Sequence, residues 1–274
     1  MRARGSCEQG WRACKSPLPP KPAPAQAIQR IHLHMPAFLP VLAWVCLILG
    51  FACAVGIAVH TLRHPQSMWI MSVVWPITGL YLGPLAVHFY RKSLPVSERD
   101  PASLHLHDAG KRFENLPPTL LQNLIAVFHC GAGCTLGDIV AENVAPALGL
   151  SFGERLLLDF AFAWAFGIAF QYVTIAPMRG LSFFPGLAAA ARADTISIAL
   201  FQAGMCAWMV LTHGVLFRAP HLTPHSAIFW FMMQIAMIAG TFAALPANAW
   251  LIRKGWKEKM PTVDPSQLAS ASAA

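Results

Sequence analysis

Side chains that can bind metal ions or carry protons recur at intervals of four residues in the stretch HCGAGCTLGDIVAE. They are Cys130, Cys134, Asp138 and Glu142. Residues four apart are neighbours on one face of a helix, so the two thiols adjoin each other and the two carboxyls adjoin further along. His129 lies about 100° around the helix axis from Cys130. The stretch therefore predicts a line of polar groups along one helix.

Three chemistries fit this line of groups, and the residue types leave all three open. Thiols with an imidazole and nearby thioethers prefer a soft metal ion, copper as Cu(I) or zinc, over hard cations. Thiol redox chemistry is the second, although Cβ atoms four residues apart on a regular helix are about 5–6 Å apart. A disulfide requires roughly 3.5–4.5 Å between them. Proton exchange by Asp138 and Glu142 is the third. The opposing interpretation is that both cysteines are small packing residues.

A proton or ion path is predicted from carboxyl and imidazole groups in other apolar segments. Ordering the segments by depth places them in one layer near the outer side of a membrane. The layer consists of Asp138, Glu142, Asp159 and His213. Ionisable groups at membrane depth usually face a bundle interior or a wet cavity.

Methionines at four-residue spacing occur in two further apolar segments, at the depth of the thiols. Methionine often fills gaps in apolar cores, so packing is the alternative interpretation. The hypothetical metal site contains His129, Cys130, Cys134, Met205, Met209, Met233 and Met237.

Small and amide side chains predict helix packing. Gly133 and Gly137 form a small-xxx-small ridge that lets another helix approach closely. Gln171, Gln202 and Gln234 each lie in an apolar segment, where we expect them to form hydrogen bonds between helices.

The composition predicts a membrane protein. Of the 274 residues, 56% are hydrophobic and only 12% are charged, with a mean hydropathy of +0.51, whereas an average soluble domain is about one quarter charged. Stretches such as AFLPVLAWVCLILGFACAVGIAV have no polar face, which excludes a soluble helical bundle.

We therefore expect an all-α, polytopic helical membrane bundle of about six transmembrane helices. Each predicted span has the roughly 20 residues that cross a bilayer as a helix. The spans are Ala37–His60, Met68–Tyr90, Thr119–Leu150, Leu156–Ala176, Thr195–Phe217 and Ser226–Ile252.

The basic residues predict the topology. With six spans and a cytoplasmic N-terminus, 17 of the 20 Lys and Arg residues lie inside, as expected because these residues collect in cytoplasmic loops. Only Arg63, Arg155 and Arg218 lie outside. We expect a protein of the cell (inner) membrane with both termini cytoplasmic. The positive net charge is then explained by topology, and nucleic acid is not expected as a partner.

The remaining segments are polar. Residues 1–36 form a basic, Pro-rich tail that we expect to be disordered, unless Met35 is the true start. Residues 37–258 form the membrane domain, with a cytoplasmic linker at 91–118. Residues 259–274 form a second disordered tail.

Several segments together resemble one bacterial family of multi-pass membrane proteins, the domain of unknown function 4396. They are MWIMSVVWPITGLYLGPLA, HCGAGCTLGDIVAE, GIAFQYVTIAPMRG, ARADTISIALFQAGMCAWM and FWFMMQIAMIAGTFAALPANAWL, within Met68–Met260. The resemblance implies a helical membrane bundle. It carries no activity to any residue.

Three functions remain open from the sequence. The first is a transporter or metal-handling protein for copper or zinc. The second is a non-enzymatic assembly protein that contacts a membrane-protein partner or a second copy of itself, with structural cysteines. The third is a membrane thiol-redox protein. No motif of a soluble enzyme occurs, which favours a function other than catalysis.

Overall fold

The computed structural model describes residues 38–64, 66, 68–94, 120–217 and 222–257. They belong to the second of two units of the chain, Met1–Met35 and Pro36–Ala274. The predicted tails and most of the predicted linker lie outside the described residues.

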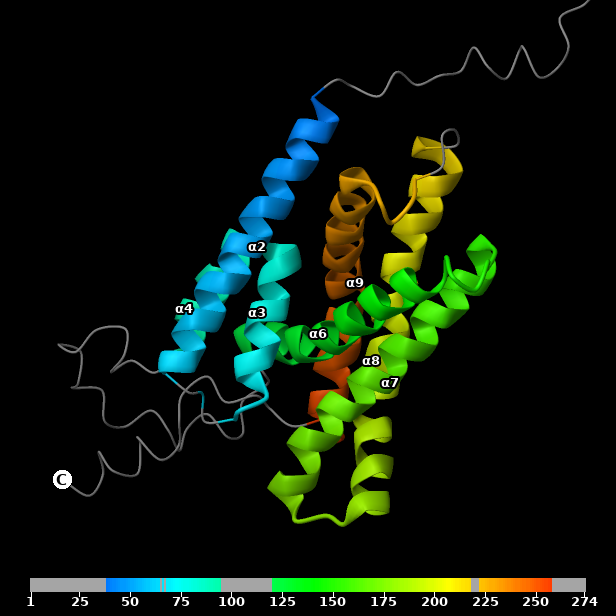
Figure 1. The fold of residues 1–274 in the computed structure, drawn as a ribbon. Helices are drawn as coiled ribbons and strands as arrows, with labels where there is room; N and C mark the ends of the chain where they lie inside the picture. Colours follow the sequence, from blue (N-terminus) through cyan, green and yellow to red (C-terminus); the bar gives the residue numbers. More distant parts are fainter. Residues whose placement is uncertain (1–37, 65, 67, 95–119, 218–221, 258–274) are drawn as a thin grey trace, which may run out of the picture. The chain divides into compact units, whose positions relative to one another are not determined.

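The described residues form helices and no strand, as predicted for an all-α bundle. Helix α8 continues directly into a short π-helix, η2. Figure 1 shows the elements α2 (Leu39–Arg63), α3 (Met71–Leu82), α4 (Pro84–Ser93), α6 (Leu120–Val144), α7 (Phe152–Arg179), α8 (Phe183–Leu211), η2 (Thr212–Leu216) and α9 (Ala227–Arg253).

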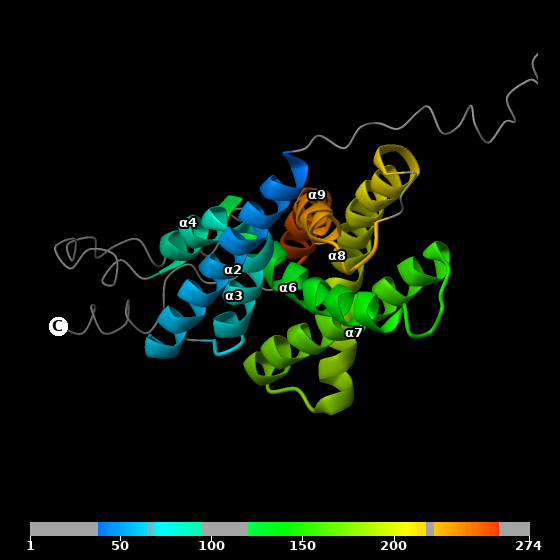
Figure 2. The same ribbon diagram turned by 45° about the horizontal axis from the view of Figure 1, so that its top comes forward.

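Five helices are long and apolar enough to cross a membrane: α2, α6, α7, α8 with η2, and α9. They make the chain a multi-pass membrane protein. The central one is α6, because 78% of its most apolar window is buried, against 22% for α2. Figure 2 shows α6 between α2 and α3 on one side and α7 and α8 on the other.

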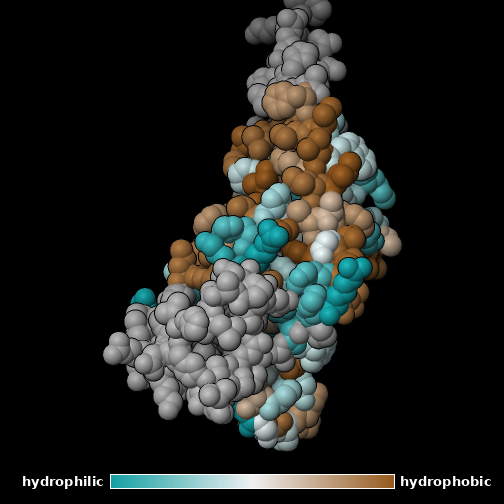
Figure 3. All heavy atoms as spheres, turned by 90° about the vertical axis from the view of Figure 1, so that its left-hand side faces the viewer, coloured by the Kyte–Doolittle hydropathy of each residue, from teal (hydrophilic) through white to brown (hydrophobic). Residues whose placement is uncertain are grey.

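The outer surface of α2 faces lipid. Its exposed side chains are large and apolar, and Trp44, Ile48 and Phe51 are each more than half exposed. Figure 3 shows hydrophobic residues concentrated along this helix. An apolar surface of this kind is stable in a bilayer and costly in water.

The predicted second span, Met68–Tyr90, is wrong as a single helix. It consists of α3 and α4, which meet at Gly83 with a φ of +53°. This conformation favours glycine, and Pro84 then begins α4, where proline is tolerated. The 12 residues of α3 extend about 18 Å, which is less than the roughly 30 Å of a bilayer core.

Helices α3 and α4 form a re-entrant hairpin. A Cβ added at Gly83 would lie 3.9 Å from the Cα of Gly50, which is near the middle of α2. The Tyr90 hydroxyl in α4 lies 2.8 Å from Nδ1 of His60, near the end of α2. The Tyr90 ring also packs against Trp75 of α3, with 5.5 Å between centroids. The hairpin therefore enters beside the end of α2, turns at mid-depth and returns to the same end.

The hairpin changes the number of crossings. In Figure 1, α2 and α9 run in the same direction, so the start of α2 and the end of α9 lie at opposite ends of the bundle. Six crossings would instead place them at the same end. The side of the membrane on which each end lies stays a prediction.

Candidate functional site

Helix α6 packs very closely against α7 at two glycines. A Cβ added at Gly133 would lie 2.7 Å from the Cα of Gly167, and one added at Gly137 would overlap the backbone of Ala163. This is the close approach expected of a small-residue ridge. It encloses the polar side chains of α6 within the bundle.

Three carboxyls lie buried beside one arginine at one end of α6. Asp138, Glu142 and Asp159 are 0%, 5% and 2% exposed. Glu142 Oε2 lies 3.9 Å from Nη1 of Arg155, and Asp138 Oδ1 accepts a hydrogen bond of 2.9 Å from Nε2 of Gln202. Asp138 also interacts electrostatically with both other carboxyls. We call these three acidic residues the carboxyl cluster.

The carboxyl cluster is short of positive charge, and several of its polar atoms have no hydrogen-bond partner among the described residues. Oδ2 of Asp138, Oδ1 of Asp159 and Oε1 of Gln202 have no hydrogen-bond partner in the part of the chain that the structure describes. Buried polar atoms are normally paired, and three ionised carboxylates beside one guanidinium would be costly. The cluster is therefore suited to holding exchangeable protons or a cation.

His213, predicted in the same layer, lies in η2. Its ring packs against Phe152, with 4.8 Å between centroids, and against Phe229, with 6.4 Å. The structure thus places His213 beside aromatic rings near the start of α7.

The predicted sulfur ligands share one part of the core. Cys130 and Cys134 are fully buried, and Sγ of Cys130 lies 3.5 Å from the Ser197 hydroxyl, which donates to it. Sδ of Met237 accepts a hydrogen bond of 3.6 Å from Thr135. One hydrophobic cluster contains Cys130, Cys134, Met205, Met209, Met233 and Met237.

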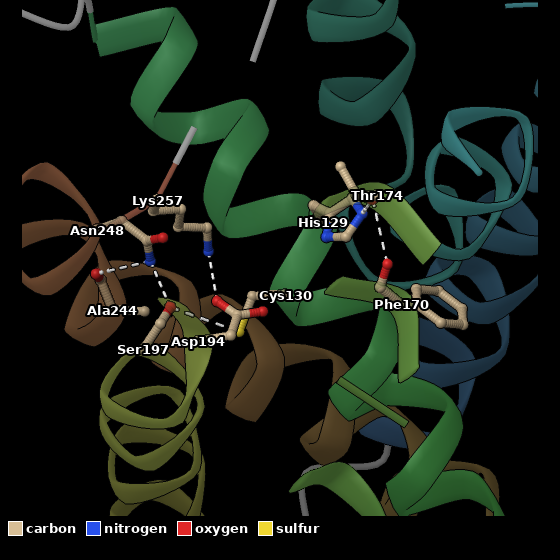
Figure 4. Close-up of polar contacts among 9 residues, drawn as sticks. All are labelled: His129, Cys130, Phe170, Thr174, Asp194, Ser197, Ala244, Asn248 and Lys257. Atoms are coloured by element: carbon tan, nitrogen blue, oxygen red, sulfur yellow. Dashed lines mark hydrogen bonds and ion pairs between the residues drawn. The ribbon is translucent and has the colours of Figure 1, made fainter. Parts of the chain in front are cut away.

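His129 points away from the thiols. Its Nε2 lies 3.0 Å from the Thr174 hydroxyl of α7, whereas Cys130 contacts α8, as Figure 4 shows. Within the described ranges, no group of three or more His, Cys, Asp or Glu residues could hold a metal ion. Any soft-metal site formed here must draw its ligands mainly from sulfur.

A buried ion pair lies beyond the thiols and was missed by sequence reasoning. Lys257 Nζ lies 2.5 Å from Oδ1 of Asp194, and both side chains have no exposed surface. The predicted span Thr195–Phe217 begins directly after Asp194, but α8 begins at Phe183, so Asp194 lies in the interior of the helix. No local signal links two residues so far apart in the chain.

Asn248 is linked to the Cys130 thiol through Ser197. Its Nδ2 donates to the Ser197 hydroxyl at 2.5 Å and to the carbonyl of Ala244 at 3.2 Å. Cys134 in turn interacts electrostatically with Asp138 and Asp194, one toward each end of α6. Figure 4 shows Cys130, Ser197 and Asn248 beside the ion pair.

The three predicted glutamines have different environments. Gln202 binds Asp138, as described above. Gln234 donates from Nε2 to the carbonyl of Leu80 at 2.7 Å, near the end of α3, and borders an apolar cavity of about 430 Å³. Gln171 is fully buried, and neither its amide nitrogen nor its oxygen has a partner among the described residues.

Gln171 lies between two contacts of α7 with α6, at Gly167 and Thr174. It therefore adds an unsatisfied amide at the level of the thiols. We call the whole series the polar column. It comprises Glu142, Asp138, Cys134 and Cys130 of α6 with Arg155, Asp159, Gln171, Asp194, Ser197, Gln202, Asn248 and Lys257.

Comparison with known proteins gave one match. A family model described as a domain of unknown function (DUF4396) matches residues 121–257, which span α6 to α9 and the polar column. No curated protein and no solved structure matched the chain.

Proposed function

Starting from the membership of this chain in the DUF4396 family, whose description states no activity, we propose that the protein is a transporter of a soft cation. The cation is copper as Cu(I) or zinc, exchanged for protons along the polar column in the cell (inner) membrane. One observation carries this proposal: thiols and carboxyls share a buried stripe of the central helix, away from lipid.

The carboxyl cluster supports proton exchange. Three buried carboxyls beside a single guanidinium carry excess negative charge when ionised, so protons or a cation must neutralise it. A cation that arrives displaces protons, and protons that return release the cation. Asp138, Glu142 and Asp159 are close enough together to take part in such an exchange.

The sulfur groups support a soft cation. Thiolates and thioethers bind Cu(I) and zinc in preference to hard cations. Cys130 and Cys134 adjoin on α6 and share a cluster with four methionines of α8 and α9. His129 is not part of this set, because it bonds to Thr174.

Proteoliposomes test transport. The full chain is reconstituted with a pH dye inside, Cu(I) or zinc is added outside under reducing conditions, and metal uptake and internal pH are followed together. We expect metal uptake with proton movement, and loss of both in Asp138→Asn. The matched control is Glu154→Gln, which removes a carboxyl that lies at the first turn of α7 and is exposed. Equal fluxes in Asp138→Asn and the wild type would overturn the proposal that protons and metal pass through the carboxyl cluster.

The amount of metal bound to the purified protein tests whether the transported ion is a soft cation. We expect near-stoichiometric metal in purified wild type and loss of metal in Cys130→Ser and in Cys134→Ser. Cys53→Ser is the control, because Cys53 is a half-buried thiol of α2. If the wild type binds no metal but still moves protons, the soft-cation cargo is wrong and the column carries protons alone.

The same measurements separate the two alternative functions. A thiol-redox protein would show reversible oxidation of Cys130 and Cys134 without any flux. An assembly protein would show neither flux nor oxidation, and Cys130→Ser would leave its partner contacts unchanged.

A further inference from the structure

A basic cavity lies at the end of the bundle where α7 ends. Its volume is about 360 Å³. The residues that line it come from the end of α7, the first half of α8 and the turn after α9, and they are Arg179, Ala188, Ala189, Arg192, Gly255 and Trp256. No acidic side chain is among these described lining residues.

Aromatic packing holds one of the two guanidiniums in place. The guanidinium carbon of Arg192 lies 4.4 Å from the centroid of the Trp256 ring. Trp256 packs in turn against Trp250 of α9, with 5.5 Å between centroids. Gly255, with a φ of +69°, turns the chain so that Trp256 folds back after α9. Arg192 is therefore positioned before any ligand arrives.

The nearest carboxylate in the sequence does not neutralise Arg192. Asp194 is directed into the bundle, where it pairs with Lys257. The guanidiniums of Arg179 and Arg192 both line the cavity, and Asp194 leaves that of Arg192 without its nearest carboxylate in the sequence. A planar guanidinium donates paired hydrogen bonds to phosphate oxygens, which makes arginine well suited to phosphate groups.

A lipid-facing apolar stripe begins beside this charge. Ile196 and Leu200 follow Arg192 at intervals of four residues on α8, and each is 40% exposed. Residues four apart share one face of a helix, so the stripe runs from the guanidinium toward the membrane interior. Ala188 and Ala189 on the other side of Arg192 are small and leave the cavity open.

We propose that this cavity binds the phosphate headgroup of an anionic phospholipid, with its acyl chains along the stripe of Ile196 and Leu200. The cavity combines positive charge for the phosphate with an adjoining apolar surface for the chains. Basic pockets between membrane helices bind anionic headgroups in this way. A free phosphate would use the arginines but not the stripe.

Lipid retention tests the site. Purified full-length protein in detergent is titrated with phosphatidylglycerol, with phosphatidylcholine of the same chain length, or with glycerol 3-phosphate, and bound molecules are counted by native mass spectrometry. We expect phosphatidylglycerol to bind most tightly. The Arg179→Gln/Arg192→Gln variant should lose about tenfold or more in its affinity, as charge-assisted hydrogen bonds are removed.

The matched control is Arg63→Gln/Arg91→Gln, which removes two exposed arginines of α2 and α4 and should bind like the wild type. Equal losses in both double variants, or equal binding of the two phospholipids, would overturn the proposal. Binding of glycerol 3-phosphate as tight as that of phosphatidylglycerol would overturn the lipid assignment. If the double variant does not fold, Arg192→Lys keeps the charge, loses the planar fork, and should bind phosphatidylglycerol more weakly than the wild type.

Discussion

Asp194 and Lys257 form an ion pair of 2.5 Å inside the bundle, with both side chains fully enclosed. The pair joins the interior of α8 to the turn that follows α9. Oδ2 of Asp194 has no further hydrogen-bond partner among the described residues, so Lys257 is the principal compensation for this buried charge. The turn after α9 is thereby tied to the polar column on one side and to the basic cavity on the other.

Lys257→Ala should strongly destabilise the protein, because it leaves the Asp194 carboxylate buried without its partner. Breaking a buried ion pair in this way costs about 3–5 kcal/mol. Thermal unfolding in detergent measures the change. The double variant Asp194→Asn/Lys257→Met should recover much of the loss, and a Lys257→Ala melting temperature equal to the wild type would contradict the prediction.

Gly137→Ala should destabilise the contact between α6 and α7. The added methyl group would overlap the backbone of Ala163, and overpacking of this kind costs about 1–3 kcal/mol. Gly56→Ala is the matched control, since a Cβ at Gly56 meets nothing within 4 Å. The test compares the unfolding temperatures of the two variants in the same detergent. Equal temperatures would contradict the prediction, because they would mean that α6 and α7 can move apart without a loss of stability.

The re-entrant hairpin predicts that Arg63 and Arg91 lie on the same side of the membrane. Six crossings would place them on opposite sides. In a cysteine-free background, Arg63→Cys and Arg91→Cys should react with an impermeant thiol reagent from the same side, and Phe38→Cys from the other. Labelling of Arg63→Cys and Arg91→Cys from opposite sides would disprove the hairpin.

The basic residues agree with this topology. Among the described residues, eight of the nine Lys and Arg residues lie toward the end of the bundle that holds Arg63 and Arg91, and only Arg155 lies toward the other. Because such residues collect on the cytoplasmic side, we expect the basic cavity of Arg179 and Arg192 to face the cytoplasm.

Asp138→Asn should abolish transport and leave the protein as stable as the wild type or more so. The amide can keep the contact with Gln202, and its neutrality removes one charge from a cluster of buried carboxyls. Melting temperature and flux are measured on the same preparation. A lower melting temperature would mean that the Asp138 carboxylate holds the fold together and is not a group kept for function.

The class of this protein was predictable from the sequence. Long apolar stretches without a polar face can be stable only in lipid, and five of the predicted spans are long helices in the structure. The spacing of Cys130, Cys134 and Asp138 predicted that they share one helical face, and all three lie buried in α6.

The true structure of the second predicted span could not be predicted from hydropathy. Hydropathy averages over a window and is insensitive to a reversal of direction within it. The Gly83–Pro84 pair lies in an apolar run that is as hydrophobic as a crossing helix. Only the contacts with Gly50 and His60 show that the chain turns back.

The neighbours of the polar stripe were likewise decided by tertiary structure. His129 was predicted to join Cys130, but the packing of α7 against Gly133 turns the imidazole to Thr174 while the thiol faces α8. Asp194 and Lys257 meet only because α8 and α9 lie side by side. Spacing along one helix determines which residues share a face, but the rotation of each helix against its neighbours determines what that face contacts.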